Sequence, residues 1–584
     1  MFREDNVEQA IIEQLKELGY EYQYAPDIER DYKEAILKDV FYESLYKINE
    51  GITEDIADEV YRKIRNFHAV DLVEANYEFY HMLYAGVEVP IEGDKTFVAK
   101  LIDRDNIENN LFQVLNQYTV IEYKEKRPDV VVFINGIPLI VFELKNAINE
   151  DTTIENAYNQ IKNYQEDIKS LFYYNAFSVI SDGINARIGT ITADFNRFMT
   201  WKSKDGEKPE DNINQIDVLL NGVFRKDRLI DIITNFILFQ NKEKGRIKIL
   251  AGYHQYFAVD KSIKSTLKAL DEHTGKAGVV WHTQGSGKSF AMVFYTGKIS
   301  KIQSLNNPTI VVLTDRNDLD NQLYETFANT NREILPQKTQ HAASRKKLKE
   351  LLSVNAGGII FTTIQKFEEG DDIISDRENI IFIVDEAHRS QYSTEKKFNR
   401  KTGEFQTGYA KKMRDSLPKA TFIAFTGTPI EYADKNTRIL FGDYIDVYDM
   451  TQAVLDNATV PIYYENRVAK LKLDENVLKE IDDEYNYIIE NDEADVETVT
   501  KSKEELAKLE TVIGAQDRLE MLSKDIIEHY EQREDILNGK AMIVCMTRKI
   551  AIDLYKEIIE KRPEWKEKIK VVLTDNNDDP TDWR

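Results

Sequence analysis

The apolar positions at the start of the chain recur with helical spacing. They lie one to four residues apart, with charged and polar residues between them, and Gly19 follows the last of them. This pattern predicts an amphipathic helix over residues 5–18, and helical patterns continue to about residue 90. The apolar residues of the first helix are Val7, Ile11, Ile12, Leu15 and Leu18.

From residue 130 the pattern changes to that of strands. Two apolar runs, Val130–Ile134 and Pro138–Leu144, are separated by Asn135-Gly136, a dipeptide that strongly favours a tight hairpin turn. The segments expected next are a helix over 154–170, strands at 177–181 and 186–192, a polar loop at 202–212 and a helix around 230–241.

Predicted strands and helices alternate between residues 251 and 450. Such alternation is typical of a parallel sheet with helices on both faces. A second unit of this kind begins with a strand at 541–546, a helix at 549–561 and a strand at 569–573. The strands expected in the first unit are 278–281, 309–313, 358–361, 380–384 and 421–425.

These patterns predict an α/β fold class with several domains. The length of 584 residues is also enough for several domains. We expect an α/β domain with a helical N-terminal part over 1–250 and a parallel-sheet domain over 251–455. The start of a second parallel-sheet domain would occupy 456–584. Within it, residues 474–510 carry fourteen carboxylates against four lysines, which we interpret as a solvated helical stretch.

Composition narrows the class of protein. No apolar run approaches the ~18 residues that span a bilayer, and the N-terminus lacks the apolar core of a signal peptide. The single cysteine, Cys545, excludes an intramolecular disulfide, so we expect a cytoplasmic protein with no membrane partner. The net charge of −25 argues against indiscriminate nucleic-acid binding, although a DNA-handling enzyme can confine its basic surface to a groove.

Residues 282–289, His-Thr-Gln-Gly-Ser-Gly-Lys-Ser, lie between a predicted strand and a helix expected over 290–299. A strand, a glycine-bearing loop and a helix in this order aim backbone N–H groups at bound phosphates. Lys288 is placed to meet the β- and γ-phosphates and Ser289 to ligate Mg²⁺, whereas His282 replaces the first glycine of the usual pattern. The residues predicted to bind the nucleotide are Thr283, Gln284, Gly285, Ser286, Gly287, Lys288 and Ser289.

An acidic pair follows the apolar run at 380–384. Ligands bind at the carboxyl ends of strands in open α/β sheets, which is where Asp385 and Glu386 lie. Asp385 can hold Mg²⁺ through water, and Glu386 can orient the water that attacks the γ-phosphate. The pair therefore completes a candidate ATPase site.

The predicted hairpin carries a second group of candidate catalytic residues. Asp129 opens its first strand, and Glu143 and Lys145 project from one face of the second. The turn brings Asp129 opposite or diagonal to Glu143, where two carboxylates can hold Mg²⁺, while the lysine stabilises charge on a scissile phosphate. Glu8 on the first helix offers a further carboxylate, although we favour a place on the helix surface for it.

The motifs after the phosphate loop resemble those of superfamily 2 helicases and translocases of the DEAH-box type, with Asp385-Glu386-Ala387-His388 as the signature. The resemblance implies that Gln255 recognises adenine. It also implies residues that couple the ATP state to nucleic acid or contact the nucleic-acid backbone, and in this chain these are Thr426, Gly427, Thr428, Arg316, Thr362 and Lys366. Hydroxyl and basic groups at strand ends suit such phosphate contacts.

The hairpin motif, Pro128-Asp129 with Glu143-Leu144-Lys145, is followed by Gln160 and Tyr164. This Gln-x-x-x-Tyr accompanies the same nuclease core in RecB-like and type I restriction families. The order of all these motifs resembles the R (motor) subunit of type I restriction enzymes. The resemblance implies ATP and Mg²⁺ as cofactors, double-stranded DNA as substrate, and methylation and specificity subunits as partners.

The resemblance also suggests a longer protein. No late Gln-x-x-Arg-x-x-Arg segment follows the second unit to supply arginines to the nucleotide, so we expect this chain to be an N-terminal part that hydrolyses ATP poorly by itself.

Two other interpretations remain open at this point. A repair helicase-nuclease acting without a modification complex would separate strands and degrade DNA processively. A DNA-binding scaffold with an inactive nuclease would use ATP only to switch conformation. Metal-dependent cleavage that is lost with Glu143→Ala would exclude the scaffold.

Overall fold

The computed structural model describes residues 4–69, 71–92, 95–145, 153–210, 214–314, 317–367, 373–386, 396–399, 404–407, 409–428, 440–465, 514, 516–534 and 539–573. The chain divides into two compact units. The first consists of Met1–Phe398 and Phe405–Pro461 and the second of Asn399–Glu404 and Ile462–Arg584. The acidic stretch at 474–510 lies outside the described residues.

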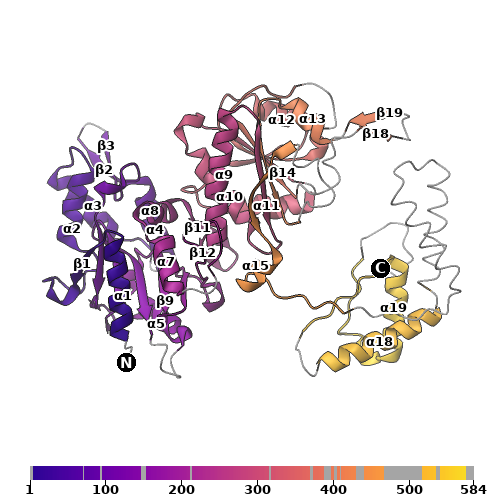
Figure 1. Ribbon diagram of the computed structural model, residues 1–584, viewed down its shortest axis with the longest axis horizontal. Helices are drawn as coiled ribbons and strands as arrows, with labels where there is room; N and C mark the ends of the chain where they lie inside the picture. The colour runs from indigo at the N-terminus through magenta and orange to yellow at the C-terminus, as the bar shows by residue number, and fades with distance from the viewer. Residues whose placement is uncertain are drawn as a thin grey trace. The chain divides into compact units, whose positions relative to one another are not determined.

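A six-stranded mixed sheet forms the centre of the N-terminal part, with strand order β1-β4-β7-β8-β9-β10 (Figure 1). β7 and β8 form an antiparallel hairpin, and β8 pairs with β9 in parallel. Every residue of β7 and β8 is buried, which explains why both read as unbroken apolar runs. The strands are β1 (Glu21–Tyr24), β4 (Phe112–Asn116), β7 (Val130–Ile134), β8 (Ile137–Leu144), β9 (Phe177–Ser181) and β10 (Ala186–Gly189).

Helices and three small hairpins surround this sheet. The expected first helix is confirmed as α1, and the helix expected over 154–170 is α5 followed by the short α6. The helices are α1 (Glu4–Glu17), α2 (Lys38–Ile48), α3 (Glu54–Arg65), α4 (Leu72–Ala85), α5 (Ile154–Asp167), α6 (Lys169–Phe172), α7 (Gln215–Val223) and α8 (Lys226–Asn235). The hairpin strands are β2 (Val87–Ile91), β3 (Lys95–Ala99), β5 (Val120–Ile121), β6 (Glu125–Lys126), β11 (Ile237–Lys242) and β12 (Gly245–Leu250).

The helix predicted around 230–241 is wrong in its second half. The helix α8 ends at Asn235, and β11 begins two residues later. Four consecutive residues of β11, from Ile237 to Gln240, are buried, and β11 pairs along its whole length with β12. One face of a helix cannot bury four residues in a row, whereas a strand packed on both sides can. Tertiary packing therefore overrides the local pattern.

A seven-stranded sheet follows, in the order β15-β16-β14-β17-β20-β13-β21, and all its pairings are parallel, as predicted. Its residues alternate between two hydrophobic cores. Val312 belongs to the core shared with α9 and α10, whereas Val311 and Leu313 belong to the core under α12 and α13. Both faces are therefore covered by helices (Figure 1).

The strands of this sheet are β13 (Lys276–His282), β14 (Thr309–Thr314), β15 (Thr339–His341), β16 (Ile359–Thr363), β17 (Ile380–Asp385), β20 (Thr421–Thr426) and β21 (Tyr444–Tyr448). The helices are α9 (Tyr253–Asp271), α10 (Lys288–Ser300), α11 (Asn317–Ala328), α12 (Arg345–Leu352), α13 (Tyr409–Ser416) and α15 (Met450–Leu455). Two further strands are β18 (Lys396–Asn399) and β19 (Glu404–Thr407). The edge strands β15 and β21 were not predicted.

The six-stranded and the seven-stranded sheet of the first unit share one hydrophobic core. Phe236 at the end of α8 packs against Phe294 of α10, with ring centroids 5.5 Å apart, and both belong to the cluster that contains β7 and β8. The boundary expected near residue 250 therefore falls between two sheets but within one compact unit.

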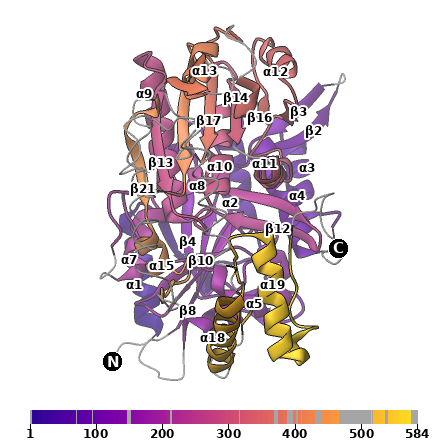
Figure 2. The same ribbon diagram turned by 90° about the vertical axis from the view of Figure 1, so that its right-hand side faces the viewer.

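In the second unit α18 (Gln516–Glu534) and α19 (Arg548–Lys561) lie side by side (Figures 1 and 2). The helix predicted at 549–561 is confirmed, but the strands predicted at 541–546 and 569–573 are wrong, because neither segment forms a strand. A strand needs a neighbour for its backbone hydrogen bonds, and no strand is present among the residues described in 514–573. Met542 and Val572 are accordingly 88% and 91% exposed.

Among the described residues, no helix is long and apolar enough to cross a membrane.

The turn between β7 and β8 generates a test of the fold. Gly136 has φ +77°, and a Cβ atom there would lie 2.7 Å from Leu37 O and Phe41 N, whereas Gly51 has the same φ and open space around it. We expect Gly51→Ala to cost about 1 kcal/mol for the left-handed backbone, and Gly136→Ala to cost about 2 kcal/mol more from overpacking. Thermal unfolding of the two variants measures the difference, and equal losses would contradict this packing.

Candidate nuclease and nucleotide sites

The hairpin β7–β8 brings the predicted nuclease residues together. Asp129 immediately precedes β7, and its Oδ2 accepts a hydrogen bond of 2.7 Å from Leu144 N of β8. Glu143 and Lys145 project from the same face, with Lys145 Nζ 2.6 Å from Glu143 Oε1. Glu143 is only 2% exposed, so this ion pair lies in a protein-lined setting. The predicted geometry of the three residues is confirmed.

Burial controls the electrostatics of this site. Desolvation, and then the neighbouring carboxylate of Glu143, raise the pKa of Asp129 to about 8, although the Leu144 N–H and Lys145 act in the opposite direction. Two carboxylates this close, Glu143 buried and Asp129 half-buried, favour a bound cation, because a cation offsets both the desolvation and the repulsion. The donor set therefore fits Mg²⁺, which prefers carboxylate oxygen ligands.

Gln160 and Tyr164, on α5, lie beside the same carboxylates. Burial and then the charge of Glu143 raise the pKa of the Tyr164 hydroxyl, whereas the neighbouring Gln160 lowers it. The phenol stays protonated and can orient the carboxylate. The structure thus gathers all five predicted residues around one hairpin end.

Glu8 also faces this site, contrary to the surface position favoured from the sequence. Its two carboxylate oxygens accept hydrogen bonds of 2.6 Å from Asn116 Nδ2 and 2.7 Å from Gln117 Nε2. Its charge contributes to the raised pKa of Asp129. Gln117 adopts a left-handed φ of +56°, which is uncommon for glutamine and marks a locally strained residue. Asn116 and Gln117 were not anticipated, since an amide pair after a strand carries no motif.

The phosphate loop has the conformation that its sequence predicts. Gly285 and Gly287 have φ +85° and +82°, and α10 begins at Lys288, directly after the second glycine. His282, in the place of the usual first glycine, is fully buried at the end of β13, where its Nε2 lies 2.9 Å from Asp446 Oδ2 of β21. The histidine therefore links the neighbouring strands β13 and β21 through this contact. This role explains why a histidine can take the place of the usual glycine.

The acidic pair lies against the loop lysine. Lys288 Nζ is 2.7 Å from Glu386 Oε1 and 3.9 Å from Asp385 Oδ1. The side chain of Lys288 is only 11% exposed, so the pair is largely shielded from water. Glu386 has φ +51°, a left-handed conformation, with its N–H donating to Asp385 Oδ1 at 2.9 Å. The carboxyl end of β17 thus faces the loop after β13, as predicted.

The residues expected to couple the nucleotide to DNA differ in their positions. Gly427 lies against the phosphate loop, because a Cβ there would be 3.1 Å from both Gln284 Cγ and Lys288 Nζ. Thr426 and Thr362 are fully buried at the ends of β20 and β16, so neither hydroxyl reaches the surface, whereas Thr428 is exposed and Lys366 is half-buried. Arg316 lies outside the described residues. A direct DNA contact by Thr362 therefore requires a different conformation.

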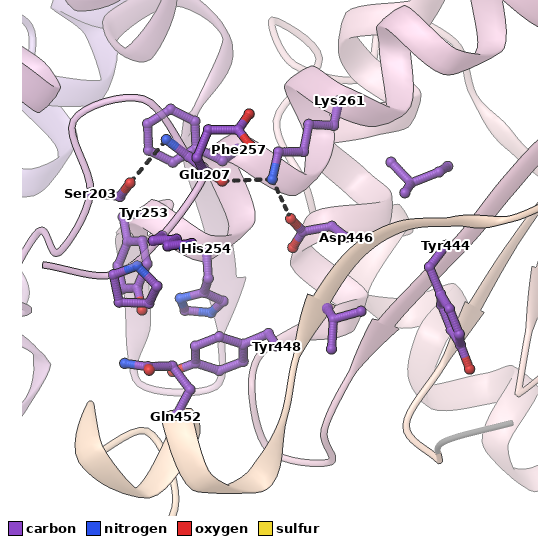
Figure 3. A pocket seen from close by; sticks show the side chains of 15 residues that line it. Ser203, Glu207, Tyr253, His254, Phe257, Lys261, Tyr444, Asp446, Tyr448 and Gln452 are labelled. Atoms are coloured by element: carbon purple, nitrogen blue, oxygen red, sulfur yellow. Dashed lines mark hydrogen bonds and ion pairs between the residues drawn. The ribbon is translucent and has the colours of Figure 1, made fainter. Parts of the chain in front are cut away.

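Gln255 lies at the start of α9, with its amide turned toward the protein. Its Oε1 accepts from Gly252 N and its Nε2 donates to Gly287 O, both at 2.9 Å. Next to it, a cavity of 260 Å³ is lined by residues 203 and 206–209, the first turns of α9, β21 and Gln452 (Figure 3). Lys261 closes one side of this cavity by donating to Gly206 O and Asp446 Oδ1 at 2.6 and 2.9 Å.

Known families match the two parts of the chain separately. Residues 1–197 match the family described as type I restriction enzyme R protein N terminus, and residues 254–498 match the SWI2/SNF2 ATPase family. The type I restriction enzyme HindI endonuclease subunit of Haemophilus influenzae is 38% identical over 609 residues, covering 99% of this chain. Over almost its whole length this chain is homologous to type I restriction endonuclease subunits.

Two further similarities concern a second relative and a solved fragment. The protein named as the type I restriction enzyme MjaIXP endonuclease subunit of Methanocaldococcus jannaschii is 39% identical over 617 residues and 99% of this chain. This type I endonuclease subunit homologue spans about half the length of its relatives, 56% in both cases. A solved fragment described as an HsdR subunit from Vibrio vulnificus YJ016 has 14% identity and a TM-score of 0.32, covering 78% of this chain and 71% of that one.

The raised pKa of Asp129 leads to a stability prediction. A carboxyl whose folded pKa, about 8, exceeds its ordinary value near 3.8 holds its proton more tightly in the folded state, so its ionisation destabilises the fold as pH rises through this window. We expect Asp129→Asn to raise the unfolding temperature of the metal-free protein at pH 8–9 by at least ~2 °C, with little effect at pH 4. Thermal unfolding against pH in EDTA measures this gain.

The matched control is Glu29→Gln, an exposed carboxylate in the same part of the chain. A gain that does not depend on pH, or one that Glu29→Gln reproduces, would contradict the account of Asp129.

Proposed function

We propose that this type I endonuclease subunit homologue couples ATP hydrolysis to movement along double-stranded DNA and cuts that DNA with Mg²⁺. The observation that carries the proposal is that one compact unit contains two chemically distinct sites. These are Asp129–Glu143–Lys145 and Lys288–Asp385–Glu386. The match of residues 254–498 to an ATPase family supports the second site. We further propose that the protein acts in the cytoplasm with methylation and specificity subunits, which would supply sequence recognition.

At the nucleotide site, each residue has a distinct task. Lys288 breaks its ion pair with Glu386 and moves to the β- and γ-phosphates, whose charge it neutralises. The released Glu386 carboxylate can then orient the attacking water. Ser289 and Asp385 would hold Mg²⁺, which screens the charge of the phosphates. Gly427 allows the chain after β20 to approach Lys288 closely. A shift of Lys288 when the nucleotide changes would therefore displace the segment that contains Gly427. This contact is our candidate for the coupling step.

At the nuclease site, Asp129 and Glu143 would hold Mg²⁺, which polarises the scissile phosphate and activates water. Lys145 compensates the Glu143 charge at 2.6 Å and is placed to stabilise the negative charge that develops on the phosphate. The Tyr164 hydroxyl lies close enough to Glu143 for that charge to raise its pKa, so we assign to Tyr164, with Gln160 beside it, the task of orienting the Glu143 carboxylate. The buried setting strengthens each of these interactions.

A pair of variants separates the two chemistries in the full-length protein. Lys288→Ala should lower DNA-stimulated ATP turnover by at least ~10²-fold, because it removes the charge that meets the phosphates, and ATP-dependent cleavage should be lost with it. Glu143→Gln keeps the volume of the side chain but removes its charge, so it should abolish cleavage while ATP turnover stays within about twofold of the original protein.

Two controls match these variants. Lys276→Ala changes an exposed lysine at the opposite end of the strand that leads into the loop, and Glu125→Ala changes an exposed carboxylate on β6. Both should behave like the original protein. Unchanged ATP turnover in Lys288→Ala would refute the nucleotide site, and persistent cutting by Glu143→Gln would remove the hairpin from catalysis.

A further inference from the structure

Gln117 follows β4 in an unusual backbone conformation. It comes directly after Asn116, the last residue of the strand, and has φ +56°, in the left-handed region that residues other than glycine rarely adopt. A glycine would take this conformation without a steric cost, yet the position carries a glutamine. Strained residues of this kind gather at functional sites, where the surrounding contacts hold them. Here the contacts involve both the side chain and the backbone of Gln117.

The left-handed backbone lets two consecutive side chains reach one carboxylate. Along an extended strand, neighbouring side chains project to opposite faces of the sheet. Asn116 and Gln117 depart from this alternation, because both amides meet Glu8. Asn116 Nδ2 donates to Glu8 Oε1 at 2.6 Å, and Gln117 Nε2 donates to Glu8 Oε2 at 2.7 Å. Hydrogen bonds to an ionised acceptor are stronger than those between neutral groups, so the two amides hold the Glu8 carboxylate firmly.

The backbone of Gln117 acts on a second acidic residue. Its N–H donates to Asp129 O at 2.9 Å, one residue beyond the pairing of Asn116 with Val130. The side chain of Asp129 is held separately, since its Oδ2 accepts from Leu144 N at 2.7 Å. One contact therefore sets the place of the Asp129 main chain, and the other sets the direction of its carboxylate.

Glu8 and Asp129 come from different elements of the fold. Glu8 lies on α1, whereas Asp129 immediately precedes β7. Glu8 is close enough to contribute to the raised pKa of Asp129. Because two like charges repel, an unrestrained Glu8 side chain would turn away from this end of the sheet. The hydrogen bond from Gln117 opposes that movement.

We propose that Gln117, assisted by Asn116, is a positioning residue of the nuclease site, which places Asp129 through its backbone N–H and Glu8 through its side-chain amide. This inference rests on the proposed Mg²⁺ binding by Asp129 and Glu143. The strain at Gln117 is then the condition for one residue to contact both acidic groups. A glycine would keep the backbone contact and lose the other.

Gln117→Gly separates the two contacts experimentally, because glycine adopts φ +56° readily and retains the N–H that reaches Asp129. In the full-length protein, we expect its affinity for Mg²⁺, measured by calorimetry without DNA or nucleotide, to fall roughly tenfold. This is the effect of one lost hydrogen bond to a charged group. DNA cutting should require correspondingly more Mg²⁺. The melting temperature and the DNA concentration that gives half-maximal cutting should stay nearly unchanged.

A second variant tests whether Gln117 acts through Glu8. In a protein that already carries Glu8→Ala, Gln117→Gly should weaken Mg²⁺ binding little further, because the amide has lost the group that it positions. The matched control is His273→Gly. His273 also has a left-handed φ of +52°, but it is exposed beyond the end of α9, so its replacement should leave Mg²⁺ binding and cutting unchanged.

Four outcomes would overturn the inference. These are an unchanged Mg²⁺ affinity in Gln117→Gly, a full additional loss on top of Glu8→Ala, a melting temperature that falls by several degrees together with cutting, and a rise only in the DNA concentration needed. The third would show a role in the fold and the fourth a contact with DNA. Glu143→Gln serves as the reference without a metal site. If the original protein binds Mg²⁺ no more tightly than Glu143→Gln, the proposed metal site itself fails.

Discussion

A shielded ammonium needs a negative partner, and the partner of Lys288 comes from a strand two places away in the sheet. β13 carries the loop that ends at Lys288, β17 carries Asp385 and Glu386, and β20 lies between them. Only parallel strands end at the same edge, so the direction of these strands is the condition for the contact. Glu386 makes this contact from a left-handed backbone conformation, which costs about 1 kcal/mol. The hydrogen bond from the Glu386 N–H to Asp385 Oδ1 holds this conformation. An incoming phosphate would have to compete with Glu386 for the lysine.

The nuclease site, unlike the phosphate loop, has an excess of carboxylates. Glu143 is paired with Lys145, whereas Asp129 keeps its proton more tightly than an ordinary carboxyl, and Glu8 adds a third carboxylate nearby. This arrangement fits a cation ligand, while the nucleotide site fits an anionic one. The two sites lie in one compact unit whose hydrophobic core runs from β8 to α10, so packed side chains connect the two sheets that carry them.

Much of this was predictable from sequence because the central strands are buried on both faces. β7 and β8, the latter from its second residue onward, follow from apolar runs and an Asn-Gly turn, and the phosphate loop follows from its glycines. The mistakes share a cause in long-range packing. β11 resembled a helix until its pairing with β12 and the burial of its first four residues were known. Glu8 looks like an ordinary helix residue, since its partners, Asn116 and Gln117, are distant in sequence.

The most direct test of the central claim, that one chain holds a motor and a nuclease that work together, is cleavage of unmodified circular DNA. The full-length protein would be mixed with the proposed methylation and specificity subunits and Mg²⁺, with and without ATP. The account predicts double-strand cutting only when ATP and both partners are present. ATP-dependent degradation from linear ends without any partner would contradict it and would indicate a repair helicase-nuclease instead.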